Sequence, residues 1–305
     1  MSPFTPTDEK LFFTKRDPLD PRLGELAGRE VADHDVVILG YPDDEGVRLN
    51  GGRIGAALGP SEIRNWLYRM TPHPARKIQT FADAGDLVSK QTIDQRHLSA
   101  IEKASDLFKR HKILSLGGGN DYAYCDGLAF LETHDNGIII NVDAHLDVRD
   151  LSVGPTSGTP FFRLLESKHK FDFLELGIQA QCNSKNHWQY VENKKGHIIT
   201  AEELSESPLS FLDYTLHATG DLFLKTRPVF LAIDIDAFAW PYASGASQSW
   251  PLGILPHDFS PFLNFLIKRM DVRGLGIYEV APPLDTGHGT AKLAAQLAHS
   301  FLHHV

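Results

Sequence analysis

Six short runs that are β-branched or otherwise apolar recur along this 305-residue chain, and segments with helical periodicity lie between them. Apolar runs of this length, bounded by polar and glycine clusters, are typical of strands buried on both faces of a sheet. The runs occupy residues 35–41, 112–119, 137–145, 173–179, 228–236 and 274–282. The clearest helix-like segments occupy residues 59–70, 94–111, 259–270 and 289–304. This alternation predicts an α/β fold with three layers, α/β/α, around a central, mostly parallel twisted sheet.

Charge and composition argue against several classes of function. Acidic and basic residues are mixed, the formal net charge is −9 and no run of five basic residues occurs, which argues against nucleic-acid binding. No apolar run approaches the length of about 18 residues that a membrane-spanning helix needs. The first residues lack the basic-then-apolar pattern of a signal peptide, and two cysteines do not make a disulfide framework. We therefore expect a cytoplasmic enzyme without a nucleic-acid or membrane partner.

Carboxylate and imidazole side chains end two of the predicted strands. They are Asp143, His145, Asp147, Asp234 and Asp236. Within a strand, side chains two residues apart point to the same side, so each set could converge. Five such groups would repel one another unless a cation lay among them. Oxygen-rich sites with an imidazole suit Mn²⁺, and two metal ions that share a water can generate hydroxide near neutral pH.

A single Asp-x-Asp pair is weak evidence for a metal site, because surface loops and helix caps often contain one. The combination is stronger here, since both sets follow apolar runs and the run at 112–119 ends in three glycines. In parallel sheets, ligands bind beyond the carboxyl ends of the strands. The sequence therefore predicts a metal site along one edge of the sheet.

These motifs resemble those of the arginase–agmatinase family, the ureohydrolases, whose members bind two Mn²⁺ through Gly-Gly-x-His, Asp-Ala-His-x-Asp and Asp-x-Asp motifs. Further segments resemble the formimidoylglutamase branch of that family. They are DDEGVRLNGGRIGAALGP at 43–60, DAHLDVR at 143–149, TSGTPF at 156–161, GIQ at 177–179 with Asn183-Ser184 after it, and EVAPPLD at 279–285. The resemblance implies a single arginase-like catalytic domain over residues 35–305. Residues 1–34 form an N-terminal segment without an assignment.

The resemblance implies two Mn²⁺ ions per chain, with the following ligands. Asp143 and Asp234 would bridge the two ions, and His145 and Asp236 would complete one of the sites. Asp147 would belong to the other site, hold the attacking hydroxide and relay a proton to the leaving amine.

Two positions depart from the general pattern of the family. Asn120 stands where the Gly-Gly-x-His motif has its metal-binding histidine. An amide oxygen can bind Mn²⁺ but is a weaker donor than imidazole, so the site that Asn120 shares with Asp147 should be the weaker one. In addition, the segment 156–161 lacks the histidine that shuttles protons in the arginase branch. This second departure favours the formimidoylglutamase branch over arginase.

Formimidoylglutamate, the substrate that the resemblance implies, carries a cationic formimino group and two carboxylates, and its hydrolysis yields glutamate and formamide. Glu279 would accept hydrogen bonds from the cationic nitrogens. The substrate carboxylates call for arginine, whose fork matches a carboxylate with two bonds. Arg149 follows the metal motif, and Arg48 and Arg53 lie in a glycine-rich loop. Asn183 is a further loop candidate. A surface ion pair for Arg149 and a structural cap for Asn183 are the alternatives left open.

Two other functions remain open from the sequence alone. The first is hydrolysis of another amidine or guanidine by an arginase, agmatinase or guanidino-acid hydrolase. The second is a metal-poor pseudoenzyme with a regulatory role, which the asparagine at position 120 suggests. In each case the expected partner is a small molecule, and the resemblance to the family also implies a homo-oligomer, either a trimer or a hexamer.

Overall fold

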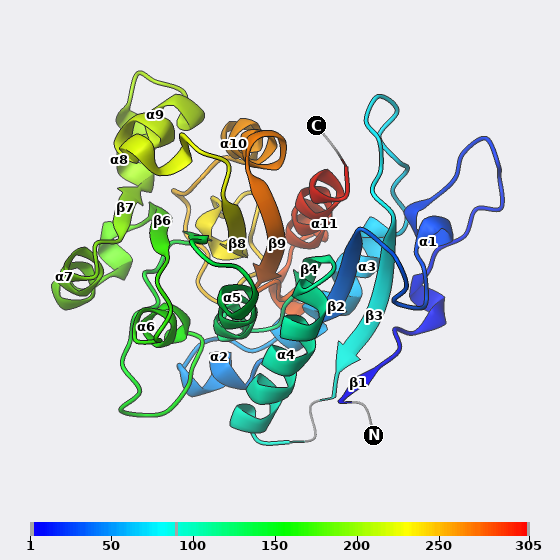
Figure 1. Ribbon diagram of the computed structural model, residues 1–305, viewed down its shortest axis with the longest axis horizontal. Helices are drawn as coiled ribbons and strands as arrows, with labels where there is room; N and C mark the ends of the chain where they lie inside the picture. Colours follow the sequence, from blue (N-terminus) through cyan, green and yellow to red (C-terminus); the bar gives the residue numbers. More distant parts are fainter. Residues whose placement is uncertain (1–2, 89–90, 304–305) are drawn as a thin grey trace.

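A single twisted sheet runs through the protein, and its nine strands are shown in Figure 1. The computed structural model describes residues 3–88 and 91–303. The spatial order of the strands is β1-β3-β2-β4-β9-β8-β5-β6-β7, and all neighbouring pairs are parallel except β1 with β3. The strands are β1 Phe4–Thr5, β2 Val36–Gly40, β3 Phe81–Leu87, β4 Lys112–Leu116, β5 Ile138–Val142, β6 Asp172–Ile178, β7 His197–Thr200, β8 Pro228–Asp234 and β9 Asp271–Tyr278.

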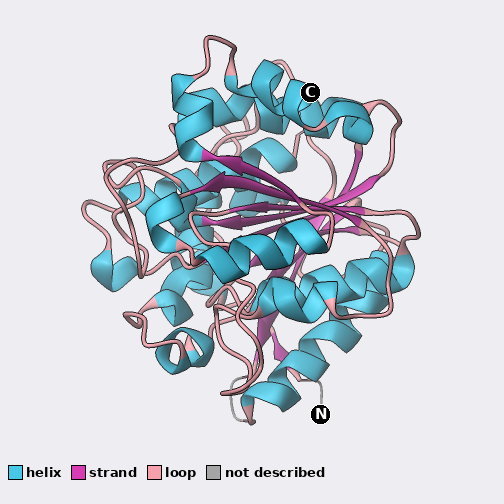
Figure 2. Ribbon diagram, turned by 90° about the vertical axis from the view of Figure 1, so that its left-hand side faces the viewer, coloured by secondary structure: helices cyan, strands magenta, loops and turns pink. Residues whose placement is uncertain are grey.

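Helices cover both faces of this sheet, as Figure 2 shows, which confirms the predicted three-layer α/β/α architecture. One face packs against α4 Ile93–Phe108, α5 Tyr122–Thr133, α6 Pro160–Leu165 and α7 Lys185–Asn193. The other packs against α1 Leu23–Leu26, α3 Gly59–Leu67, α8 Ala201–Glu206, α9 Phe211–Ala218, α10 Pro256–Arg269 and α11 Gly289–Phe301.

The strands are apolar on both sides because each side faces a separate core. In β5, Ile138 and Ile140 pack into one core, whereas Ile139 packs into the other. This is the alternation expected for a strand buried between two helical layers. All six predicted strands and all four predicted helices are present. Most of the predicted strands extended too far at their carboxyl ends. The polar residues at these ends belong to the loops of the site.

The N-terminal segment adds the antiparallel edge strand β1, which the sequence did not predict. This strand lies close against β3, where a Cβ at Gly85 would meet the Thr5 carbonyl oxygen at 1.9 Å. Beneath it, the Arg64 guanidinium of α3 forms a buried ion pair with Asp83 of β3 at 2.7 Å. Thr7 donates a hydrogen bond to the same carboxylate at 2.8 Å. The segment is thereby fixed to the edge of the sheet by both backbone and side-chain contacts.

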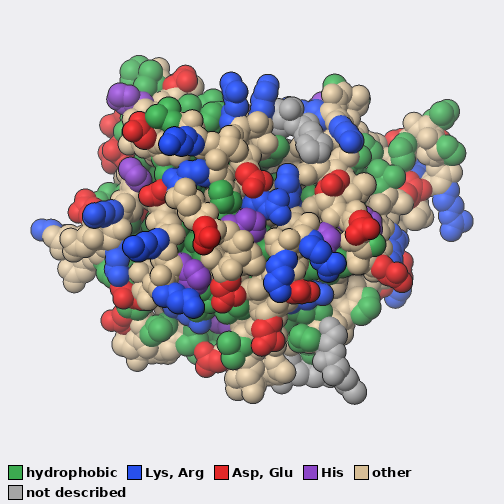
Figure 3. Space-filling view, viewed as in Figure 1, with side chains coloured by type: hydrophobic (Ala, Val, Ile, Leu, Met, Phe, Trp, Pro, Cys, Tyr) green, Lys and Arg blue, Asp and Glu red, His purple; other side chains and the backbone are tan. Residues whose placement is uncertain are grey.

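The exposed surface carries charged side chains of both signs (Figure 3). On the face shown in Figure 3, lysine and arginine side chains are interspersed with aspartate and glutamate. No helix in the described ranges is long and apolar enough to cross a membrane.

Candidate metal centre

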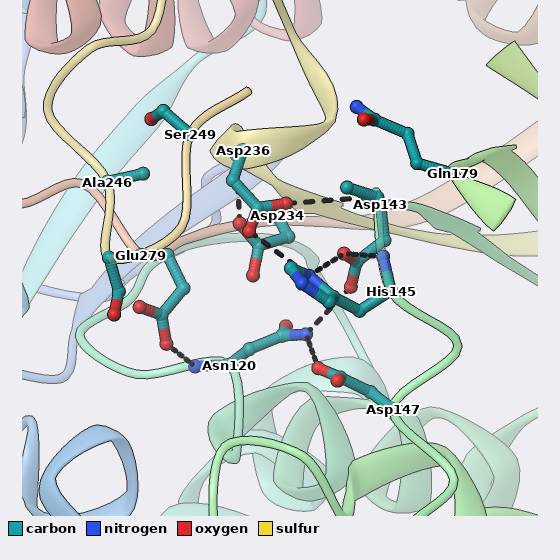
Figure 4. A network of polar contacts seen from close by, with 12 residues as sticks. Asn120, Asp143, His145, Asp147, Gln179, Asp234, Asp236, Ala246, Ser249 and Glu279 are labelled. Atoms are coloured by element: carbon teal, nitrogen blue, oxygen red, sulfur yellow. Dashed lines mark hydrogen bonds and ion pairs between the residues drawn. The ribbon is translucent and has the colours of Figure 1, made fainter. Parts of the chain in front are cut away.

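The residues predicted to bind metal, together with the predicted catalytic residue Glu279, meet at the carboxyl ends of four adjacent strands, β4, β9, β8 and β5. Asn120 follows β4, Glu279 follows β9, Asp234 ends β8 and Asp143 follows β5. Because neighbouring parallel strands end at the same edge, these side chains lie close together although they are far apart in the sequence. Figure 4 shows them turned toward a common centre, with His145, Asp147 and Asp236 beside them.

The side chains form two overlapping groups with the geometry of metal-ligand sets. One contains Asp143, His145 and Asp236, and the other contains Asp143, Asp147 and Asp234. In each group the potential ligand atoms lie within 4.8 Å of one another. The His145 Nδ1 atom is 3.2 Å from Asp236 Oδ2 and 3.5 Å from Asp143 Oδ1. Asp143 belongs to both groups and is fully buried.

The sequence predicted that these side chains converge through the alternation of side chains along a strand. That explanation was wrong, because most of them lie in loops and turns after the strands. Strand β5 ends at Val142, so the Asp-Ala-His-Leu-Asp motif lies in a loop. Asp147 has a left-handed backbone with φ +47°. Asp236 belongs to the short 3₁₀ turn Ile235–Ala237, where its backbone N–H donates to Asp234 Oδ1 at 2.9 Å. Left-handed conformations of non-glycine residues store strain and occur at sites where the surroundings enforce them.

The electrostatics of the cluster favour a bound cation. Burial raises the pKa of Asp143, Asp234 and Glu279 well above the ordinary range, and repulsion between neighbouring carboxylates raises it further. Burial also raises the pKa of Asp147 to about 6. Burial lowers the pKa of His145, but the Asp236 carboxylate and hydrogen bonds outweigh this, and the net shift is upward. The charge of one protonated imidazole is too small to balance the negative charge of several carboxylates. Divalent cations bound among the carboxylates would supply the missing positive charge.

Asn120 lies in a tight glycine turn that brings it into the cluster. A Cβ at Gly118 would lie 1.8 Å from the Asp43 carbonyl oxygen, so the turn requires glycine there. The Asn120 backbone N–H donates to Glu279 Oε1 at 2.9 Å, and its Nδ2 donates to Asp147 at 2.8 Å and Asp143 at 3.2 Å. Its Oδ1 atom is buried and has no hydrogen-bond partner among the described residues. Glu279 itself has a left-handed backbone, with φ +63°.

A cavity of about 310 Å³ opens above the cluster, a volume suited to a small molecule. Arg149 lines this cavity, and its positive charge favours the ionised form of Asp147. Its guanidinium forms no hydrogen bond or ion pair with another side chain in the described part of the chain. Asn183 also lines it, but its side chain already bonds the Leu146 N–H at 2.8 Å and the Ala144 carbonyl at 2.9 Å. These bonds hold the backbone of the loop that contains Asp143, His145 and Asp147. Asn183 therefore has the structural role that was the alternative to substrate binding.

Arg48 and Arg53 both lie outside the lining of the cavity. Arg48 was predicted to lie in a loop, but it belongs to the short helix α2 Glu45–Leu49. Arg48 is exposed and pairs with Glu45 at 3.3 Å. The Arg53 guanidinium donates to the backbone carbonyls of Ser247 at 2.9 Å and Ala246 at 3.0 Å. Arg53 therefore anchors the loop that forms one wall of the cavity.

Several residues that line the cavity were not identified from the sequence. They are Asn50, Ser157, Cys182, His187, Ser247, Gln248 and Trp250. Asn50 and Ser157 lie in two of the segments that resemble formimidoylglutamases, and they bond to each other at 3.2 Å. That resemblance was a usable signal for these two. His187 and the 247–250 loop belong to no motif, so only the fold reveals their position.

Comparison with known proteins assigns the chain to a family. The model of the arginase family matches residues 34–304. The chain belongs to the arginase family. Among curated members, the formimidoylglutamase of Staphylococcus aureus strain JH9 is 33% identical over 272 residues, which cover 88% of this chain and 85% of that protein.

Solved structures of other proteins share the fold. Trypanosoma cruzi formiminoglutamase, solved with Mn²⁺, has a TM-score of 0.82 at 30% identity, over 93% of this chain and 97% of that one. Formimidoylglutamase from Bacillus subtilis has a TM-score of 0.86 at 25% identity, over 95% and 93%. Proclavaminate amidino hydrolase from Streptomyces clavuligerus, at 24% identity and a TM-score of 0.75, shares the fold alone.

Proposed function

We propose that this arginase-family protein is a manganese-dependent hydrolase that converts formimidoylglutamate and water into glutamate and formamide. The observation that carries the proposal is the pair of ligand groups that share Asp143 at the base of a cavity lined by the unpaired Arg149. A metal pair suits attack on the formimino carbon, and a free guanidinium suits a substrate carboxylate. The formimidoylglutamases of S. aureus and B. subtilis, and the T. cruzi enzyme with Mn²⁺, support the same reaction.

The donor atoms of the cluster fit two Mn²⁺ ions. Carboxylate oxygens with one imidazole are ligands that Mn²⁺ accepts. The unpartnered Oδ1 of Asn120 is a buried acceptor, and rotating its amide by a half-turn would exchange the oxygen with the nitrogen that now faces Asp147 and Asp143. When bound, the ions would supply an activated water and positive charge for the developing negative charge of the reaction.

The protein groups have distinct tasks in the proposed reaction. Glu279, buried at the end of β9, would accept hydrogen bonds from the cationic formimino nitrogens. Asp147 would carry the proton from the attacking water to the leaving amine, since it lies on the cavity wall. Arg149 would hold one substrate carboxylate and so fix the orientation of the formimino carbon.

The reaction is tested by assaying release of formamide and glutamate from formimidoylglutamate by the Mn²⁺-loaded protein. Arginine, agmatine and guanidinobutyrate serve as competing substrates, with urea as the measured product. We expect turnover of formimidoylglutamate with the highest kcat/KM of the four. Higher efficiency on a guanidine would reassign the protein to another branch of the family, and no turnover by a fully loaded protein would favour a regulatory role.

Arg149→Ala should lower kcat/KM for formimidoylglutamate by about 10- to 100-fold, because a hydrogen-bonded ion pair to the substrate is lost. The assay is repeated with an analogue that lacks one carboxylate, for which the variant and the wild type should differ much less. Arg110→Ala, which removes an exposed arginine in the turn after α4, is the control and should leave both rates unchanged. An equal fractional loss on both substrates would show that Arg149 does not bind that carboxylate.

Asn120→His should tighten binding of the second Mn²⁺ ion, because imidazole is a stronger donor than an amide oxygen. Titration of Mn²⁺ into the metal-free wild type should show one tight and one weak site. In the variant, the affinities of the two sites should be more nearly equal. Occupancy and turnover are both measured across the titration. Tighter binding by the wild type than by the variant would contradict the assignment of Asn120 as a ligand. A variant that binds more metal without faster turnover would show that weak occupancy does not limit activity.

The homo-oligomeric state, a trimer or hexamer, and the cytoplasmic location stay predictions. So does the absence of nucleic-acid and membrane partners. Size-exclusion chromatography with light scattering would decide the oligomeric state.

A further inference from the structure

A chain of buried polar side chains runs from the neighbouring strand β6 to the metal cluster. Asn141 of β5 and Glu175 of β6 are partners in the parallel register, and both are fully buried. The Asn141 Nδ2 atom donates to Glu175 Oε2 at 2.8 Å and to Asp143 Oδ2 at 3.3 Å. One amide nitrogen thus uses both of its hydrogens on two carboxylates. Asp143 is the residue that the two candidate ligand groups share.

The chemistry of the two acceptors fixes the orientation of the Asn141 amide. Carboxylate oxygens accept hydrogen bonds, so the nitrogen must face both Glu175 and Asp143, and the amide oxygen must point elsewhere. That oxygen and Glu175 Oε1 are buried without a hydrogen-bond partner in the described chain. Leaving buried polar atoms unpaired costs stability, so an apolar pair would serve a purely structural role better at these positions.

We propose that Asn141 and Glu175 are positioning residues that hold the Asp143 carboxylate in the orientation needed to bind both metal ions. Glu175 orients the Asn141 amide, and the amide donates to Asp143. This inference rests on the proposed metal-dependent function and extends it to residues of the sheet interior. Neither residue lines the cavity, so they act on substrate through Asp143 alone.

Rigid support of this kind matters most for the carboxylate shared by the two groups. A ligand that contacts two ions must keep both oxygens in fixed directions, whereas a ligand to one ion can rotate and still bind. Asp143 Oδ1 is already held by the His145 backbone N–H at 2.7 Å. The Asn141 amide donates to Oδ2, which also accepts a bond from Asn120 at 3.2 Å. Rotation of the Asn120 amide to present its oxygen to a metal ion would leave Asn141 as the side-chain donor to Oδ2 among these two residues. Hydrogen-bond partners of metal ligands typically contribute 10- to 100-fold to metal affinity or activity.

The test measures Mn²⁺ affinity by calorimetric titration of metal-free protein, together with the melting temperature of each metal-free variant. Asn141→Leu removes the hydrogen-bond donor and Glu175→Leu removes its acceptor, and leucine is similar in size to both residues. Each variant should bind Mn²⁺ about 10- to 100-fold more weakly. Glu175→Gln keeps an oxygen for the Asn141 amide and should stay within a few-fold of the wild type. Ile139→Val, a buried apolar change in β5, is the control for general weakening of the strand and should leave the affinity unchanged.

A double variant separates positioning from structural support. If Glu175 acts through Asn141, the variant that carries both leucine substitutions should bind Mn²⁺ no more weakly than Asn141→Leu alone. Affinities equal to the wild type in both single variants would overturn the proposal, as would additive losses or an equal loss in Ile139→Val. Should Asn141→Leu fail to fold, the contrast between Glu175→Leu and Glu175→Gln decides the question. A wild-type chain that binds no Mn²⁺ would instead overturn the proposed function, and this inference with it.

Discussion

Asp143→Ala should abolish Mn²⁺ binding and turnover together. The Asp143 carboxylate belongs to both ligand groups, so its removal takes a ligand from each ion. Each group then retains two of its three potential protein ligands. We expect less than one Mn²⁺ per chain after dialysis, measured by metal analysis, and no formamide release above background.

The control for this variant is Asp126→Asn, which alters an equally buried carboxyl outside the ligand groups. Asp126 accepts hydrogen bonds from Tyr41 and Tyr278, each at 2.6 Å, and an asparagine oxygen can still accept one of them. This control should keep its metal. Two Mn²⁺ per chain and near-normal turnover in Asp143→Ala would disprove the assignment of the cluster.

Asp147→Asn should lower kcat by about 10² to 10⁴ while leaving KM within a few-fold, because the proton relay to the leaving amine is lost. The asparagine keeps the shape of the side chain and an oxygen that can face the metal, so binding of Mn²⁺ should fall less than turnover. Steady-state kinetics and metal analysis on the same preparation separate the two effects.

Asp150→Asn is the matched control, since Asp150 is an exposed carboxylate three residues further along the same loop. It should retain the kcat of the wild type. If Asp147→Asn lost activity only in proportion to lost metal, Asp147 would be a ligand without a role in proton transfer. Unchanged kcat in Asp147→Asn would exclude both roles.

The fold was largely predictable because its central strands are buried on both faces. Runs such as residues 137–145 and 228–236 contain little but apolar residues until they reach the site, which marks them as interior strands. The strands near the edges of the sheet were harder to predict. Strand β1 is two residues long, and β7 has half-buried residues, so neither carries an apolar run. Strand β3 contains Asp83 and Asp86, whose charges are balanced by Arg64 of α3, a pairing that only the fold brings together.

The metal cluster was predictable because motif residues lie next to those runs. The sequence could not show why they converge, since the loop geometry depends on Asp147 and Glu279 in left-handed conformations. The position of Arg149 two residues after Asp147 favoured it as a residue of the cavity, where it lies. The sequence could not show that Arg53 instead anchors the cavity wall. The supporting pair Asn141 and Glu175 was hidden because two polar residues in buried strands carry no motif. Their significance comes from the register that pairs them behind Asp143.

Metal-dependent hydrolysis of formimidoylglutamate is tested most directly by removing and restoring the metal in one preparation. The protein is treated with a chelator, dialysed and titrated with Mn²⁺, while bound metal and formamide release are measured at each point. We predict that activity on formimidoylglutamate is lost with the metal and returns as occupancy approaches two Mn²⁺ per chain. Formamide release that persists in metal-free protein would contradict this account, as would full occupancy without turnover.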